Sequence, residues 1–148
     1  MERPSFERFD RAIAETMIRT NNQAGQGIPH YLGVQFVALD AGHLHAVLPV
    51  REDLLTPFGT LHGGVMAALV DHVLGCVLYP LMGPGQWAAT TEFKLNYLAP
   101  VGKGTLEAES TVLSLTKRTA VVRVEVTYGE RLACVAQGTL LVVDPRGQ

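Results

Sequence analysis

The chain has 148 residues, 47% of them hydrophobic and 18% charged, which is typical of one globular domain with a substantial core. Twelve Lys and Arg residues against fourteen Asp and Glu residues give a formal charge of -2, which argues against nucleic acid as a partner. The N-terminus has no apolar segment and no run reaches the roughly 18 apolar residues of a membrane span, so we expect neither export nor a membrane partner. Cys76 and Cys134 lie in apolar runs, where thiols usually serve as packing groups, and this favours a reducing, cytoplasmic location.

The elements expected along the chain form one domain over residues 1–148. Apolar residues at spacings of three and four predict an amphipathic helix over about residues 5–22. Residues 33–50 alternate between apolar and other side chains on either side of a turn at 40–43, which predicts a β-hairpin. The same alternation and short turns predict antiparallel strands over 91–97, 105–115, 120–127 and 132–143.

The segment from Gly64 to Tyr79 is the most apolar part of the chain. Except at Asp71 and His72 it is apolar or small on every side, as in a helix enclosed by protein. Its length of about 16 residues is short for a membrane span. One long buried helix with about six antiparallel strands curling around it, over a core of about residues 33–143, predicts an α+β fold.

Asp71 is the strongest chemical signal, because a carboxylate within an apolar helix is costly unless it is paired or used. No Lys or Arg lies within that helix. His62, Gly63 and Gly64 stand at its start, where uncovered N–H groups and the helix dipole can hold an oxyanion or a polarised carbonyl. Two structural alternatives remain: Asp71 faces solvent or caps a loop, and the glycines only permit tight packing.

The spacing of these features has a consequence for assembly. Gly63 and Asp71 are eight residues apart, or about 12 Å along one helix, too far to act on one carbonyl. A second, antiparallel copy of the helix would place its Asp71 beside the first copy's Gly63. If both residues are catalytic, the protein works as a dimer with composite sites.

The run TPFGTLHGGVMAALVD at 56–71, followed by LNYLAP at 95–100, resembles the acyl-CoA thioesterases of the hotdog fold. The similarity is to the PaaI-like branch of the 4-hydroxybenzoyl-CoA thioesterase superfamily, and the order of elements matches over about residues 33–143. It implies a homodimer or dimer of dimers in which a continuous sheet wraps the helices. It also implies acyl-CoA bound across the interface, with neither a metal nor an organic cofactor.

The resemblance implies a role for each matching residue. Asp71 corresponds to the general base for water or the nucleophile, Gly63 to the glycine whose N–H polarises the thioester carbonyl, and His62 to the histidine that holds the loop and helix start. Thr90 falls where the family often has a Ser or Thr that orients water, although it could be a plain strand hydroxyl. Thr56 stands where related enzymes often have Asn, so its hydroxyl substitutes for the amide or the position is idle.

Four further residues are expected to bind substrate. Gly64 and Tyr97 belong to the two motifs, and Tyr97 could line an acyl pocket or simply belong to the core. Lys117 and Arg118, at a turn between strands, could meet the phosphates of CoA, although exposed turn cations are often only solvated.

A metal site is not expected, because His62 and Asp71 are separated by the length of the helix and Asp71 and His72 point about 100° apart.

Hydrolysis of acyl-CoA to a carboxylic acid and CoA is the activity that we expect. A thioester carbonyl is electrophilic and its thiolate leaves readily, so one base and one N–H donor can suffice. The alternatives are a hotdog acyl-thioester dehydratase or hydratase, which would need a paired His and acid, and a non-catalytic acyl-CoA-binding protein.

Overall fold

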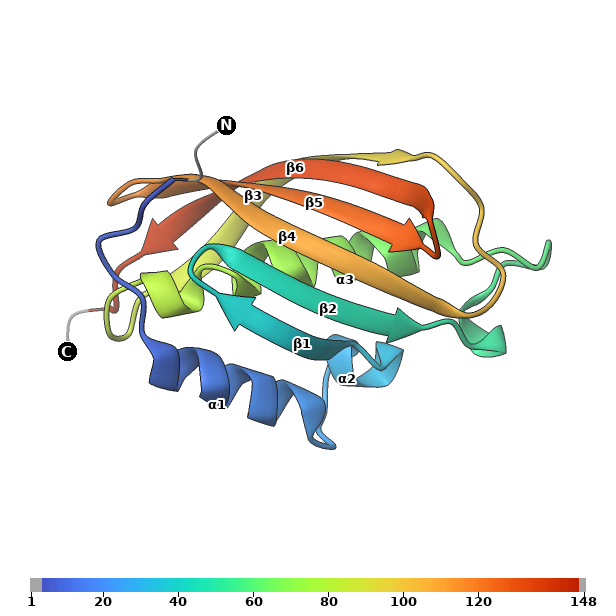
Figure 1. Ribbon diagram of the computed structural model, residues 1–148, viewed down its shortest axis with the longest axis horizontal. Coiled ribbons are helices and arrows are strands. Elements are labelled where there is room, and N and C mark those ends of the chain that lie inside the picture. The colour runs from blue at the N-terminus through green and yellow to red at the C-terminus, as the bar shows by residue number, and fades with distance from the viewer. Residues whose placement is uncertain (1–3, 147–148) are drawn as a thin grey trace.

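The computed structural model describes residues 4–146, so both ends of the expected domain, 1–3 and 147–148, lie outside the described residues. The elements are α1 (Arg11–Asn22), α2 (Ile28–Leu32), β1 (Gln35–Asp40), β2 (His43–Pro49), α3 (Gly63–Cys76), β3 (Trp87–Tyr97), β4 (Thr105–Leu115), β5 (Thr119–Tyr128) and β6 (Arg131–Val143), with short 3-10 helices η1 (Glu52–Leu54) and η2 (Tyr79–Leu81). Figure 1 shows α3 lying along the inner side of the curved sheet, with α1 and α2 beside β1.

The strands form one antiparallel sheet of six, in the order β1-β2-β4-β5-β6-β3. Strands β1 and β3 are therefore its two edges. The predicted α+β hotdog architecture is confirmed: a six-stranded sheet surrounds a long central helix, and another helix precedes it.

The core lies between α3 and the inner face of the sheet. Because side chains alternate along a strand, every second residue over 44–48 of β2, 106–112 of β4 and 120–126 of β5 points towards the helix and is buried. The largest fully buried side chains are Leu44, Leu48, Leu69, Leu74, Leu78, Leu106 and Leu140. Ser110 on β4 is the one buried polar residue in the part of the chain that the structure describes, and its hydroxyl donates to the Val73 carbonyl of α3 over 3.1 Å.

The N-terminal helix is shorter than predicted. It begins at Arg11 rather than near residue 5, because the Asp10 side chain caps it by accepting the Ile13 N–H over 3.1 Å. Phe6 and Phe9, which the helical periodicity included, pack on the core from an irregular segment instead. The short helix α2 was not predicted.

The central helix begins at Gly63 and ends at Cys76, so the predicted range of 64–79 extended too far at its C-terminal end. The stretch 63–81 is also long and apolar enough by composition to cross a membrane, contrary to the sequence expectation. Half of it is buried inside this fold, and the core helix of a folded domain meets the same criterion. Gly64 and Asp71 lie on its exposed side.

Candidate active site

The start of α3 is built around His62, the N-cap residue. The Nδ1 atom of His62 accepts the N–H of Gly64 over 2.9 Å, so this donor is engaged within the protein. The N–H of Gly63 has no acceptor among residues 4–146 and stands at the positive end of the helix dipole. Of the two glycines, Gly63 is the one with a donor free for a ligand.

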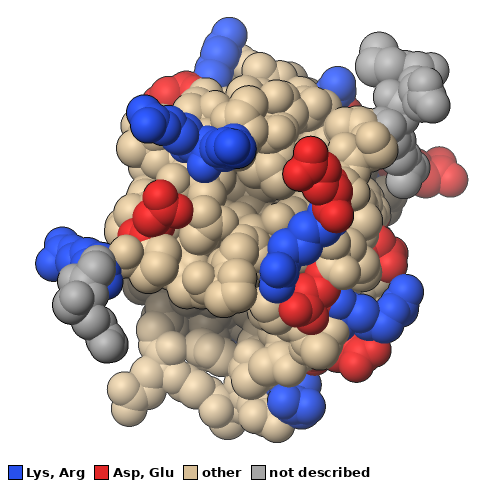
Figure 2. Space-filling model, turned by 90° about the vertical axis from the view of Figure 1, so that its left-hand side faces the viewer, with Lys and Arg blue, Asp and Glu red and all other residues tan. Residues whose placement is uncertain are grey.

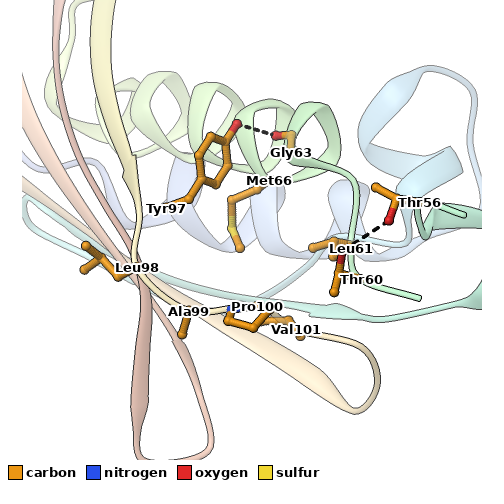
Figure 3. A pocket seen from close by; sticks show the side chains of 10 residues that line it. All are labelled: Thr56, Thr60, Leu61, Gly63, Met66, Tyr97, Leu98, Ala99, Pro100 and Val101. Carbon is orange, nitrogen blue, oxygen red and sulfur yellow. Dashed lines mark hydrogen bonds between the residues drawn. The ribbon is translucent and has the colours of Figure 1, made fainter. Parts of the chain in front are cut away.

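Tyr97, the last residue of β3, lies over this helix start. Its hydroxyl donates to the Gly63 carbonyl over 2.8 Å, as Figure 3 shows. The sequence motifs at 62–64 and 95–100 therefore meet in space.

A cavity of about 450 Å³ opens beside Gly63. None of its lining side chains carries a charge, so it suits a neutral or apolar group rather than the phosphates of CoA. The lining residues are Thr56, Thr60, Leu61, Gly63, Met66, Tyr97, Leu98, Ala99, Pro100 and Val101.

Thr56 lines this cavity but also stabilises the loop before α3. Its Oγ1 lies 3.1 Å from Oγ1 of Thr60 and accepts the Phe58 N–H over 3.3 Å. Thr56 therefore shares a cavity with Gly63, and its hydroxyl has partners in the turn.

Asp71 opens onto a different cavity, of about 520 Å³, between α3 and β3. Thr90 lines the same cavity, so the structure brings these two predicted residues together. A β-bulge falls at Thr91, whose own hydroxyl donates to the Thr139 carbonyl over 2.9 Å. Within one chain Asp71 is exposed, which is the solvent-facing position considered from the sequence.

The two cavities share no lining residue. Gly63, Tyr97 and Thr56 form one group and Asp71 and Thr90 the other, on the same helix. A single copy of the chain does not join the predicted donor to the predicted base.

His72, the neighbour of Asp71, points into the protein. Its Nε2 lies 3.1 Å from Asn21 Oδ1 on α1, and its ring stacks on Phe36 with a centroid distance of 5.4 Å. Burial lowers its pKa from 6.5 to about 4, so the ring is neutral near pH 7. Nε2 then carries the proton that Asn21 accepts, and His72 is a structural link rather than a second acid at the site.

Lys117 and Arg118 lie in the β4–β5 turn, at the opposite end of the sheet from Gly63 within one chain. They line a third cavity, of about 800 Å³, with residues of the N-terminal segment. Figure 2 shows this end of the molecule, where basic and acidic side chains are interspersed around a hollow. The structure does not bring these cations to the Gly63 cavity of their own chain.

Among the described residues, no group of three or more His, Cys, Asp or Glu side chains is placed to hold a metal ion. Burial raises the pKa of Cys76 to about 12 and that of Cys134 to about 11, so both thiols stay protonated. Neither is a candidate nucleophile.

The thioesterase superfamily profile matches residues 58–135, which include the HGG sequence, Asp71 and residues 95–100. The chain belongs to the thioesterase superfamily. The predicted resemblance to the thioesterase superfamily and the predicted thioester hydrolase activity are therefore confirmed. The PaaI protein of E. coli, at 21% identity and a TM-score of 0.72, shares the fold.

Individual relatives agree with this membership. A 1,4-dihydroxy-2-naphthoyl-CoA hydrolase from Listeria monocytogenes is 28% identical over 81% of this chain and 98% of its own. A thioesterase from Haemophilus influenzae superimposes with a TM-score of 0.82 at 25% identity, over 91% of this chain and 93% of that one. A Streptococcus mutans protein bound to acetyl CoA has a TM-score of 0.70 at 28% identity, over 77% and 91%.

The cavity of this thioesterase includes residues that sequence reasoning missed as site residues. Thr60 and Leu61 precede the HGG motif, and the run 98–101 follows Tyr97. The available signal was the LAP sequence after β3, which was used only for the resemblance. Pro100 has no N–H to donate to a strand, and the carbonyl of the next residue, Val101, accepts the Leu61 N–H over 2.6 Å, which joins this run to the loop before α3.

Proposed function

We propose that this thioesterase hydrolyses acyl-CoA at composite sites formed between two copies of the chain. The observation that carries the proposal is that Gly63 and Asp71 line separate cavities on one helix, about 12 Å apart along its axis. Two copies related by a two-fold axis would place each Asp71 beside the partner's Gly63.

The reaction needs one donor and one base. The Gly63 N–H donates a hydrogen bond to the thioester oxygen as negative charge develops there. Asp71 from the other copy either takes a proton from the attacking water or attacks the carbonyl carbon itself. With water as the nucleophile, collapse of the tetrahedral intermediate gives the carboxylic acid and expels the thiolate of CoA, which takes up the proton. With Asp71 as the nucleophile, the same collapse leaves an acyl anhydride of Asp71, and water then hydrolyses it to the acid and free Asp71. Thr90 would orient the water in either route. His62 caps the helix, which supports a holding role.

The edge strand β3 offers the surface for pairing. It is 11 residues long and bonded on one side only, to β6. Antiparallel pairing of two β3 strands would continue the sheet across both copies and bring the exposed faces of the α3 helices together.

The same pairing would give Lys117 and Arg118 a role in binding. Because β3 strands pair antiparallel, the β4–β5 turn of one copy comes to the same end of the joined sheet as the partner's Gly63. The uncharged cavity would then hold the acyl or pantetheine part of the substrate, and the two cations its phosphates. The relatives that hydrolyse a CoA ester or bind acetyl CoA support this substrate class.

A thiol-release assay over aliphatic and aromatic acyl-CoAs tests the activity. We expect release of CoA with some members of the panel, and loss of about 100-fold or more in kcat for Asp71→Asn. Binding of acyl-CoAs without release would favour the non-catalytic alternative. Hydration of enoyl-CoA without thiol release would favour the hydratase.

Mixing two inactive variants tests the composite site. In a heterodimer of Asp71→Asn and Gly63→Val, one site combines the intact Gly63 and Asp71 and the other has neither. After refolding a 1:1 mixture, we expect about one quarter of the wild-type activity, because half of the dimers are mixed and half of their sites are intact. If mass spectrometry shows that mixed dimers have formed but the mixture remains inactive, the proposal is contradicted.

A further inference from the structure

Two hydrogen bonds hold one peptide group at the start of α3. The Tyr97 hydroxyl donates to the carbonyl of Gly63 over 2.8 Å, and the N–H of Gly64 donates to Nδ1 of His62 over 2.9 Å. This carbonyl and this N–H belong to the same peptide unit. The two bonds therefore polarise each other and fix the orientation of its plane.

The bond from Tyr97 is not required to satisfy buried groups. Tyr97 is 59% exposed, so water could serve its hydroxyl. The Gly63 carbonyl lies in the first turn of α3, where the helix itself supplies a donor. The bond instead joins the end of β3 to the start of α3, across 34 residues of sequence.

The approach of Tyr97 also explains why position 63 has no side chain. A Cβ atom built at Gly63 would lie 2.9 Å from the Tyr97 hydroxyl oxygen, shorter than real Cβ contacts show, and 3.1 Å from its Cζ atom, which is tighter than most. Glycine permits the bond, but it also leaves the neighbouring peptide plane with wide conformational freedom. That neighbouring plane carries the free Gly63 N–H.

We infer that Tyr97 is a positioning residue for the Gly63 donor. By holding the peptide plane after Gly63 against the His62 cap, it limits rotation about the Gly63 Cα and aims the Gly63 N–H into the uncharged cavity. The inference rests on the proposed function of Gly63 as the donor to the thioester oxygen. Tyr97 acts through Gly63, and its hydroxyl proton is already committed to the protein.

Tyr97→Phe tests this role because it keeps the ring and removes only the hydroxyl. We expect kcat to fall between about 10- and about 100-fold with KM changed less than about twofold, since a misdirected donor weakens transition-state binding most. Tyr128→Phe is the matched control. It removes a hydroxyl at the same end of the sheet that forms no hydrogen bond with any residue in 4–146.

Amide hydrogen exchange supplies a readout that does not depend on activity. We expect the Gly64 amide to exchange at least about tenfold faster in Tyr97→Phe than in the wild type, with the core amides of β4 and β5 unchanged. Unchanged Gly64 exchange, or a kcat equal to that of the Tyr128→Phe control, would overturn the inference. A wild type without thioesterase activity would instead refute the proposed function, while the exchange result would still decide whether Tyr97 holds the helix start.

A double-mutant cycle with Gly63→Ala gives a second test. The added methyl group meets the far end of the Tyr97 side chain, which can swing away, so the variant should fold but lose the Tyr97 bond. If both changes act through that bond, Gly63→Ala combined with Tyr97→Phe lowers kcat no further than the stronger single variant. If instead the kcat of the double variant falls by the product of the two single losses, Tyr97 acts independently of Gly63.

Discussion

Acidification is expected to destabilise the fold through His72. Burial lowers its pKa from 6.5 to about 4, with the charge of His30 acting in the same direction and that of Asp71 opposing it. The unfolded chain therefore binds a proton at this residue before the folded protein does. His72 costs no stability above about pH 6.5, and the free energy of unfolding falls as the pH drops from there towards 4.

The size of the effect follows from the same pKa values. One pKa unit corresponds to about 1.4 kcal/mol, so the difference between 6.5 and about 4 is worth roughly 3 kcal/mol. A protonated ring would also strain the packing, because Nδ1 faces the Sγ atom of Cys76 at 3.7 Å, and a thiol that stays protonated is a poor partner for a second N–H.

Urea unfolding at a series of pH values, at one fixed protein concentration, measures the effect. We compare the wild type with His72→Gln, which cannot titrate, and with His45→Gln, which removes an imidazole from the outer face of the sheet. The fall in unfolding free energy between about pH 6.5 and about pH 4 should be smaller by roughly 3 kcal/mol in His72→Gln and persist in His45→Gln. An equal fall in His72→Gln and the wild type would refute the reasoning.

Other predictions concern single residues. In the thiol-release assay, the kcat of His62→Asn should be at least about tenfold higher than that of His62→Ala, because Asn also accepts an N-cap hydrogen bond. An equal fall in kcat in both variants would point to proton transfer by the imidazole. Gly138→Ala should lower the free energy of unfolding by about 1–3 kcal/mol, and with it the thermal midpoint, because the added Cβ would lie 2.7 Å from Cβ of Phe93. An unchanged midpoint would show that β3 can shift to accommodate the added methyl group. Ser110→Ala should cost about 1 kcal/mol in urea unfolding through the lost bond to Val73, and a stabilised variant would contradict this. Treatment with EDTA should leave the thioesterase rate unchanged, and loss of activity restored by a divalent ion would refute a metal-free mechanism.

Much of the fold was predictable because its strands alternate cleanly. Strand β4 matches its predicted range, β5 is longer than predicted by one residue at each end, and β6 begins one residue earlier than predicted. The helices were harder, because Phe6 and Phe9 fit a helical period without being helical. A cap such as Asp10, which decides where α1 begins, gives only a weak signal in a sequence.

The site was predictable as a set of residues but not as an arrangement. Helical spacing alone separated Gly63 from Asp71, and the structure places them in different cavities. The engagement of Gly64 by His62, and the bond from Tyr97 to Gly63, depend on side-chain orientations across elements that no local pattern encodes.

The two edges of the sheet differ in a way that limits assembly. At β1, the side chain of Asn22 accepts the Phe36 N–H over 2.7 Å and donates to the Phe36 carbonyl over 2.8 Å, so α1 occupies the outward backbone groups of Phe36, with which another strand would pair. The β3 edge has no such cover among residues 4–146. A sheet with one unpaired edge can pair with the same edge of a second copy only once, because the joined sheet then has no unpaired edge. If two copies pair through β3, as we propose, strand addition would therefore end at two chains, and further growth at β1 would first require α1 to detach.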